Sequence, residues 1–251
     1  MNKKLKNRIL IAISLLAFAN FAGAETPSGE YECILEPHTT VNIGSPSDGV
    51  LEKVLVDRGD YVSKGQLLAR LTSGVEEASI ELTKARLKFS RIKVSRNEEL
   101  ASKNLIPAID KDEMAMENNV NQVALHRDEE VLKMRHIFSP LDGVVVERIL
   151  SAGEHVRQEK AQIVKLAQID PLNVEMVLPA SLYGAIKVGM TADVLPEAPV
   201  NGEHKAKVVV VDSVVDAASG TFGVRLNLPN PGNRIPAGFK CRVRIGGLNV
   251  K

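Results

Sequence analysis

The sequence predicts a mainly β fold into which an α-helical coiled-coil hairpin is inserted. Three observations predict this fold class: a β motif occurs twice, a helical period replaces the β period between the two copies, and short strand patterns follow the second copy. A β motif of roughly 30 residues has too little core to fold alone, so the two copies are expected to pack on each other. The hairpin then projects from a split β sandwich, and a small β-barrel follows.

The two copies of the β motif share one spacing of turn residues. The first begins Ser45-Pro46-Ser47-Asp48-Gly49-Val50, and the second begins Ser139-Pro140-Leu141-Asp142-Gly143-Val144. In each copy, fourteen positions separate the Ser from a later Gly, and a Val follows three positions after that Gly. The predicted halves of the domain are residues 41–74 and 137–168. Turns are expected at six positions, where Gly tolerates a positive φ: Asp48, Gly49, Gly59, Asp142, Gly143 and Gly153.

Residues 75–136 between the copies have a helical period. Apolar residues recur at alternating steps of four and three, the heptad spacing of helices that pack along a seam. On the first arm these residues are Ala78, Leu82, Ala85, Phe89 and Ile92, and on the second Met116, Val120 and Val123. Arg127 and Glu130 continue the second series where an apolar residue is expected, so they are predicted to pair with the first arm, or to face water or a neighbouring subunit. The tip is expected near residues 102–109, because Pro107 is tolerated only in the first turn of a helix.

Residues 169–251 are predicted to form the β-barrel. Short strand patterns alternate with turns rich in Pro and Gly, which is typical of a small barrel or sandwich. The expected strands are Leu172–Leu178, Thr191–Leu195, Lys205–Val211, Gly223–Leu228 and Cys241–Ile245.

The N-terminus has the pattern of a secretory signal over residues 1–24. Basic residues precede an apolar run from Ile9 to Phe21, and Ala22-Gly23-Ala24 provides the small residues of a cleavage site. The alternative is an uncleaved membrane anchor, although the run is short for a span of ~20 residues. Residues 25–40 are assigned to an N-terminal segment that joins the barrel. Export places Cys33 and Cys241 where a disulfide can form, and the alternative is two unpaired, partly buried thiols.

Composition and motifs argue against several other functions. Aromatic residues are 4% of the chain and Lys plus Arg balance Asp plus Glu at 32 to 31, unlike a nucleic-acid-binding surface. The five His are scattered, so no metal site is predicted, and no catalytic constellation is recognisable. A swinging-arm carrier would present a modified Lys between the two β copies, where this chain has residues 75–136 instead. We therefore expect a non-enzymatic protein with no cofactor and no metal.

The order of these elements resembles a known family. The β copies resemble the two halves of a biotinyl/lipoyl domain, and the whole of residues 41–246 resembles the periplasmic adaptor, or membrane fusion, proteins of the HlyD-like family. The most specific part is the C-terminal pattern, in which Pro229-Asn230-Pro231 and Ile235-Pro236-Ala237-Gly238-Phe239 precede the last strand, Cys241–Ile245. Val188-Gly189-Met190 is similar to an earlier turn of the family's barrel.

The resemblance implies a function in a tripartite efflux system. The chain would link an inner-membrane transporter, of the resistance-nodulation-division type, to an outer-membrane channel, and would self-associate as a hexamer or a trimer of dimers in the periplasm. At the hairpin tip, Arg96 and Leu100 match the family's channel contacts, Ile106 lies beside them, and Pro107 replaces the family's Ser or Thr. The alternative is a periplasmic scaffold or regulatory adaptor that does not dock on a channel. The exported substrate and an ABC-type transporter are left open.

Overall fold

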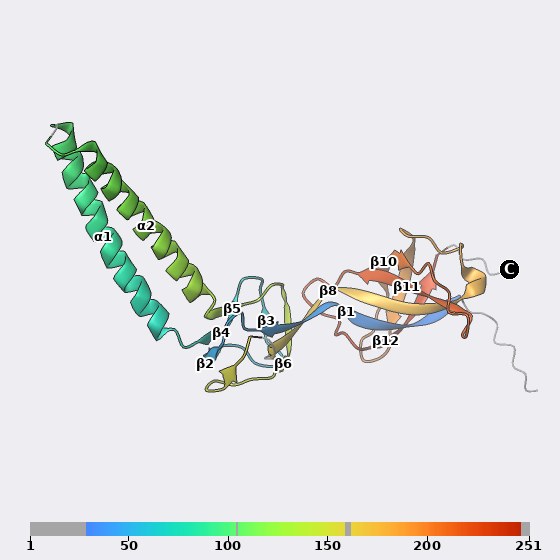
Figure 1. Cartoon of the computed structure of the whole chain (residues 1–251). Coiled ribbons are helices and arrows are strands. Elements are labelled where there is room, and N and C mark those ends of the chain that lie inside the picture. Colours follow the sequence, from blue (N-terminus) through green and yellow to red (C-terminus); the bar gives the residue numbers. More distant parts are fainter. Residues whose placement is uncertain (1–28, 104, 159–161, 247–251) are drawn as a thin grey trace, which may run out of the picture. The chain divides into compact units, whose positions relative to one another are not determined.

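The structure, a computed structural model, describes residues 29–103, 105–158 and 162–246 (Figure 1). The predicted signal segment, residues 1–24, lies outside the described residues. The described chain divides into two compact units, one with residues 34–175 and 226–239, the other with residues 29–33, 176–225 and 240–246. Three strands contribute residues to both units: β1 (Glu30–Gly44), β8 (Gln162–Pro179) and β11 (Thr221–Leu228).

The two β copies fold into one body, as the duplication predicts. The first copy supplies β2 (Gly49–Val54), β3 (Tyr61–Val62) and β4 (Leu67–Leu71), and the second supplies β5 (His136–Phe138), β6 (Gly143–Arg148), β7 (His155–Val156) and the start of β8. Strands of one copy pair antiparallel with strands of the other, β2 with β7 and β3 with β6. Both copies also contribute to one apolar core, which includes Leu51, Val62, Leu71, Val145, Val156 and Leu166.

The contacts between the copies are reciprocal. Asp48 of the first copy accepts a hydrogen bond from the backbone N–H of Gln158 at 2.7 Å, and Asp142 of the second accepts one from the N–H of Lys64 at 2.9 Å. These equivalent carboxylates each satisfy a backbone donor in the opposite copy. The repeated Asp therefore ties the copies together, a role beyond that of a turn residue.

Two of the repeated glycines lie in turns that require their conformation. Gly59 and Gly153 have φ values of 94° and 91°, in the left-handed region that residues with a Cβ adopt at a cost. Their N–H groups donate across the interface, from Gly59 to the carbonyl of Val145 and from Gly153 to that of Leu51. The spacing of these glycines in the sequence therefore reflects a pair of equivalent turns.

The other two repeated glycines, Gly49 and Gly143, do not occupy turns with a positive φ. Gly49 and Gly143 are the first residues of β2 and β6, and neither has a positive φ. A Cβ on Gly143 would lie 2.5 Å from the backbone oxygen of Ala167, and one on Gly49 would lie 2.9 Å from Nη1 of Arg135. The prediction of a positive φ was wrong at these two positions. At Gly143 a backbone oxygen leaves no space for a Cβ, and at Gly49 the guanidinium of Arg135 would have to shift.

The helical hairpin joins the two β copies. Helix α1 (Gly74–Ser102) is followed by α2 (Ala108–Lys133), and the two run antiparallel, side by side (Figure 1). With 29 residues at about 1.5 Å per residue, α1 is ~43 Å long. Pro107 directly precedes α2, where its missing N–H removes no helical hydrogen bond.

The remaining strands close a barrel of six. The strand order is β1, β12 (Lys240–Ile245), β9 (Thr191–Pro196), β10 (His204–Val211), β11 and β8, and β1 also pairs with β8. A short 3₁₀-helix, η1 (Ala180–Leu182), follows β8. In β12, buried Cys241, Val243 and Ile245 alternate with charged residues, because successive side chains of a strand point to opposite faces. The strands begin and end within a few residues of the predicted ones, except that β8 starts ten residues earlier than expected.

Candidate functional site

The root of the hairpin is held by a partly buried ion pair. Arg135, just after α2, donates from Nε and Nη2 to Oε1 of Glu76 in the first turn of α1, at 2.9 and 2.5 Å. Its Nη1 also donates to the backbone carbonyl of Asp48 in the first β copy. The two side chains are only 21% and 12% exposed, so water screens their attraction weakly. Arg135 therefore ties both helices to the turn beneath them.

The pKa of Glu76 reports the same contact. Burial raises the pKa of this carboxyl, but a hydrogen bond from its own backbone N–H and the hydrogen bond and charge of Arg135 outweigh that effect, and the pKa lies below its usual value. Glu76 is thus held as a carboxylate when Arg135 is in place. This pair was not predictable from the sequence, because residues 59 positions apart leave no local spacing signal.

The seam between the helices contains a buried polar cluster around Asp128. Oδ2 of Asp128 on α2 accepts hydrogen bonds from Thr83 at 2.7 Å and from Ser79 at 3.2 Å, both on α1. Its Oδ1 accepts two more, from Nε and Nη2 of the neighbouring Arg127. The Thr83 hydroxyl and then Arg127 lower the pKa of Asp128 against the effect of burial. Arg127 was expected to pair with the first arm, or to face water or a neighbouring subunit; its side chain is 71% exposed and pairs with Asp128 on its own helix.

Further polar contacts fix the register of the two helices toward the tip. Lys93 forms a salt bridge with Glu117 at 2.9 Å, and the hydrogen bond and charge of Glu117 raise the pKa of Lys93. Asn97 donates to the sulfur of Met114 at 2.9 Å. The two residue numbers of each pair add up to about 210. A constant sum is expected of two antiparallel helices, because one number rises as the other falls along the seam.

The heptad prediction was right in period and wrong in phase. The inward-facing residues of α1 are Ile80, Thr83, Leu87, Ser90, Val94 and Asn97, again at steps of three and four. Four of the residues predicted for the seam of α1 follow an inward-facing residue by two positions, about 200° around the helix, and therefore lie on the opposite side: Leu82, Ala85, Phe89 and Ile92. Phe89 is 67% exposed, for example, and Met116 is 68% exposed. The sequence favoured the outer series because it is wholly apolar, whereas Thr, Ser and Asn occupy half of the seam positions of α1.

The predicted channel contacts lie at the free end of the hairpin. Arg96 is exposed in the last two turns of α1, and the carbonyl of Leu100 accepts the N–H groups of Lys103 and Leu105, which closes the helix end. Leu100 is 39% exposed and Ile106 half-buried. Arg96, Leu100, Ile106 and Pro107 thus fall within about 12 residues that include the connection between the helices.

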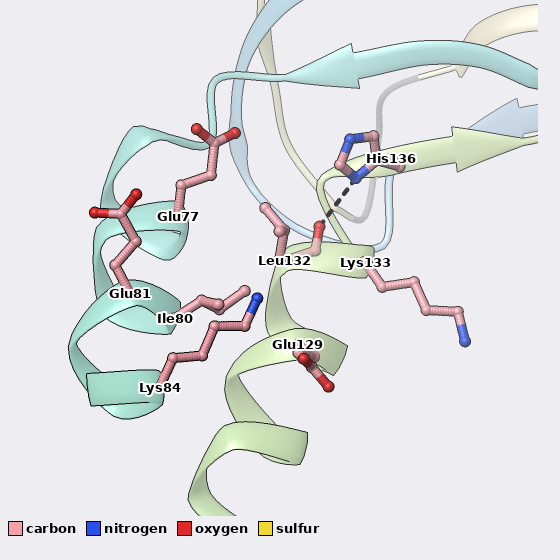
Figure 2. A pocket seen from close by; sticks show the side chains of 8 residues that line it. All are labelled: Glu77, Ile80, Glu81, Lys84, Glu129, Leu132, Lys133 and His136. Atoms are coloured by element: carbon pink, nitrogen blue, oxygen red, sulfur yellow. Dashed lines mark hydrogen bonds between the residues drawn. The ribbon is translucent and has the colours of Figure 1, made fainter. Parts of the chain in front are cut away.

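A groove opens between the helices near their root. Figure 2 shows side chains of α1 and α2 facing each other across it, and its volume is about 530 Å³. The lining residues are Glu77, Ile80, Glu81, Lys84, Glu129, Leu132, Lys133 and His136. Nδ1 of His136, the first residue of β5, lies 3.2 Å from the carbonyl oxygen of Leu132, so the ring contacts the last turn of α2. Across the described ranges, no three His, Cys, Asp or Glu side chains gather in a way that suits a metal ion.

The barrel carries the predicted cysteine pair. A disulfide joins Cys33 in β1 to Cys241 in β12, and both residues are buried. Beside it, Glu30 accepts hydrogen bonds from Arg242 and Arg244 at 3.0 and 2.7 Å. The Arg244 hydrogen bond is the largest influence on Glu30 and lowers its pKa. These contacts fasten the first residues of β1 to the last strand.

Two family models match consecutive parts of the chain. A CzcB-like barrel-sandwich hybrid domain matches residues 39–168, and a CusB-like β-barrel domain matches residues 172–248. The chain belongs to the membrane fusion protein family. This family was expected from the duplicated β motif and the C-terminal pattern, and the expectation is confirmed. Within the described residues, no helix combines the length and the apolar character of a membrane span.

Curated relatives of this membrane fusion protein are distant and longer. The cobalt-zinc-cadmium resistance protein CzcB of Cupriavidus metallidurans is 24% identical over 218 residues, 81% of this chain and 42% of the relative. The macrolide export protein MacA of Yersinia pestis is 25% identical over 244 residues, 84% of this chain and 65% of the relative. The chain spans about half the length of the curated relatives it matches.

Solved structures share the fold. A MacA–MexA chimera that contains the Pseudomonas aeruginosa MexA α-hairpin domain superposes with a TM-score of 0.72 at 20% identity, over 86% of this chain and 77% of the chimera. MacA of Actinobacillus actinomycetemcomitans superposes with a TM-score of 0.58 at 19% identity, over 86% of this chain and 78% of that one.

Proposed function

We propose that this membrane fusion protein is the periplasmic adaptor subunit of a tripartite efflux system with a transporter of the resistance-nodulation-division type. In this proposal the barrel contacts the inner-membrane transporter, and the hairpin tip contacts an outer-membrane channel. The protein supplies no catalytic group, and the transporter supplies the energy. The observation that carries the proposal is the hairpin itself, a long projection fixed at its root by Arg135 and ending in Arg96 and Leu100.

The relatives support the same role. The names of these relatives describe export of macrolides and of pyoverdine, and resistance to cobalt, zinc and cadmium. Such different cargoes are consistent with a shared connecting part and separate transporters. We therefore assign no substrate to this chain.

The proposal includes location and assembly. Residues 1–24 act as an export signal, and the protein lies in the periplasm at the inner membrane, where a disulfide between Cys33 and Cys241 is stable. Copies assemble as a hexamer or a trimer of dimers around the transport path. The hairpin packs as a coiled coil on the seam that begins at Ile80 and Thr83.

In-cell photocrosslinking tests the two proposed contacts. A photoreactive amino acid at Leu100 is expected to give an adduct with an outer-membrane channel protein, identified by mass spectrometry. The same amino acid at Val188, 65% exposed in the barrel unit, is expected to give an adduct with an inner-membrane transporter. Position Arg91, exposed on the shaft of α1, is the control for non-specific capture.

The alternative function is a scaffold or regulatory adaptor that does not reach a channel. Pro107 favours this alternative, because it replaces the hydroxyl residue of the family's tip pattern. A transporter adduct from Val188 without a channel adduct from Leu100 would support the scaffold. If neither position gives an adduct, both the adaptor and the scaffold functions are contradicted.

A further inference from the structure

The disulfide of the barrel joins its first strand to its last. Cys33 lies in β1 and Cys241 in β12, 208 positions apart, and these two strands are neighbours in the sheet. The residues on either side of Cys241 are exposed, whereas Cys241 is 1% exposed and Cys33 is 3% exposed. Both cysteine side chains therefore point into the barrel, and solvent does not reach them while β1 lies on β12.

A cluster of charges on the outer face holds the start of β1 on β12. Glu30, the first residue of β1, accepts hydrogen bonds from Arg242 and Arg244, which alternate with inward-facing residues of β12. The side chain of Glu30 is 22% exposed, whereas those of the two Arg are 59% and 51% exposed. Glu30 lies three residues before Cys33, so its contacts restrain the part of β1 that carries the cysteine.

Thiol–disulfide exchange needs an access to sulfur that the closed barrel does not give. The reaction proceeds by attack of a thiolate on a disulfide sulfur, through a mixed disulfide, and its rate depends on which sulfurs can be reached. A dithiol reagent, or the active-site disulfide of another protein, must contact a sulfur of Cys33 or Cys241 directly. Because both side chains are buried, that contact requires a local opening in which β1 leaves β12.

We infer that the cysteine pair exchanges with redox partners only in an opened state of the barrel, in which the start of β1 has left β12. In the forward direction the chain is the substrate of a dithiol–disulfide oxidant. The thiolate of Cys33 or Cys241 attacks the oxidant's disulfide and releases one of its sulfurs as a thiolate. The second cysteine thiolate then attacks the protein sulfur of the mixed disulfide. The chain loses two electrons and two protons, and the oxidant leaves as a dithiol.

The opened state also gives the oxidation a place in the order of events. This order rests on the export included in the proposed function, which supplies the oxidising compartment. Cys241 lies in β12, the last strand of the described residues, so oxidation follows export of that strand and precedes the closing of β1 on it. The sequence contains two cysteines, so a single intramolecular pairing exists and no disulfide isomerisation is required.

Reduction of the purified, oxidised full chain tests the inference, because reduction passes through the same opened state as oxidation. Dithiothreitol is added in native buffer, samples are quenched with a maleimide-coupled polyethylene glycol, and the reduced fraction is measured from the shift on a denaturing gel. The rate in native buffer is expected to be at least about tenfold below the rate in concentrated urea. Equal rates would overturn the inference, because they would show that reductant reaches the sulfurs in the closed barrel.

Glu30→Gln is the variant that favours the opened state. It is expected to raise the rate of reduction in native buffer about threefold, because the amide keeps the shape of the side chain and loses its attraction to two Arg. Asp193→Asn is the matched control, since it removes a salt bridge to Lys205 between β9 and β10 and is expected to leave the rate unchanged. Circular dichroism verifies that both variants are folded. No acceleration by Glu30→Gln, or an equal acceleration by Asp193→Asn, would contradict opening of β1 from β12.

Oxidative refolding gives a second readout. The reduced, urea-unfolded chain is diluted at low concentration into buffer that contains reduced and oxidised glutathione, with and without a protein disulfide isomerase. The same final yield of thiol-free monomer is expected in both, and a yield that depends on the isomerase would contradict the single pairing. Because these measurements use only the purified chain, they are independent of the channel and transporter adducts that test the proposed function.

Discussion

Replacing Arg135 with Met is expected to destabilise the hairpin root by about 2–3 kcal/mol. A hydrogen bond to a charged group contributes roughly 1.5–3 kcal/mol, and breaking a fully buried ion pair costs ~3–5 kcal/mol. Arg135 makes two hydrogen bonds to Glu76 and one to Asp48, but about a fifth of its side chain is exposed, which favours the lower end of that range. Met preserves most of the apolar stem, so the loss reports the guanidinium.

A double-mutant cycle isolates the Arg135–Glu76 contact. Urea unfolding followed by far-UV circular dichroism of Arg135→Met, Glu76→Gln and the double variant is expected to give a coupling energy of about 1–2 kcal/mol. Arg148 and Asp57 form the control pair, 3.5 Å apart with 39% and 64% of their side chains exposed, and are expected to couple by less than ~0.5 kcal/mol. Equal coupling in the two pairs would refute the reasoning that burial strengthens the pair at the root.

Three further predictions follow from the described contacts. The pKa of Glu76 is lower in the folded protein than its unfolded value of 4.5. Its contribution to stability is therefore complete when the pH is above 4.5 and is lost as the pH falls through the folded-state pKa, so Glu76→Gln should make helix content less sensitive to acid. Gly143→Ala, which brings a Cβ against a backbone oxygen, should cost about 1–3 kcal/mol in urea unfolding. Gly49→Ala should cost less, because its Cβ meets side-chain atoms of Arg135 and Leu71 and no backbone atom; equal losses would contradict this explanation. Reduction of the disulfide, or the double substitution Cys33→Ser with Cys241→Ser, should lower the stability of the barrel by about 2–5 kcal/mol. If the double variant melts at the same temperature as the unsubstituted protein, both without dithiothreitol, the disulfide contributes nothing.

Much of the fold was readable from spacing alone. The repeated Ser-Pro, Asp and Gly positions predicted a β body made from two copies, because two turns of the same kind need the same residues in the same places. Gly59 and Gly153 have the backbone conformation that this reading requires. The change to a heptad period likewise located two helices, since the spacing of apolar residues follows the pitch of the helix.

Only the tertiary structure decided which face of each helix is inside. Both faces repeat every seven residues, and the apolar series at Leu82 and Phe89 is the outer one, because hydroxyl and carboxylate groups such as Thr83 and Asp128 satisfy each other within the seam. Partners distant in sequence were equally unreadable, as with Arg135 and Glu76. Periodicity along a chain records how often a residue faces one direction, whereas the choice of the direction that is buried depends on which side chains meet across space.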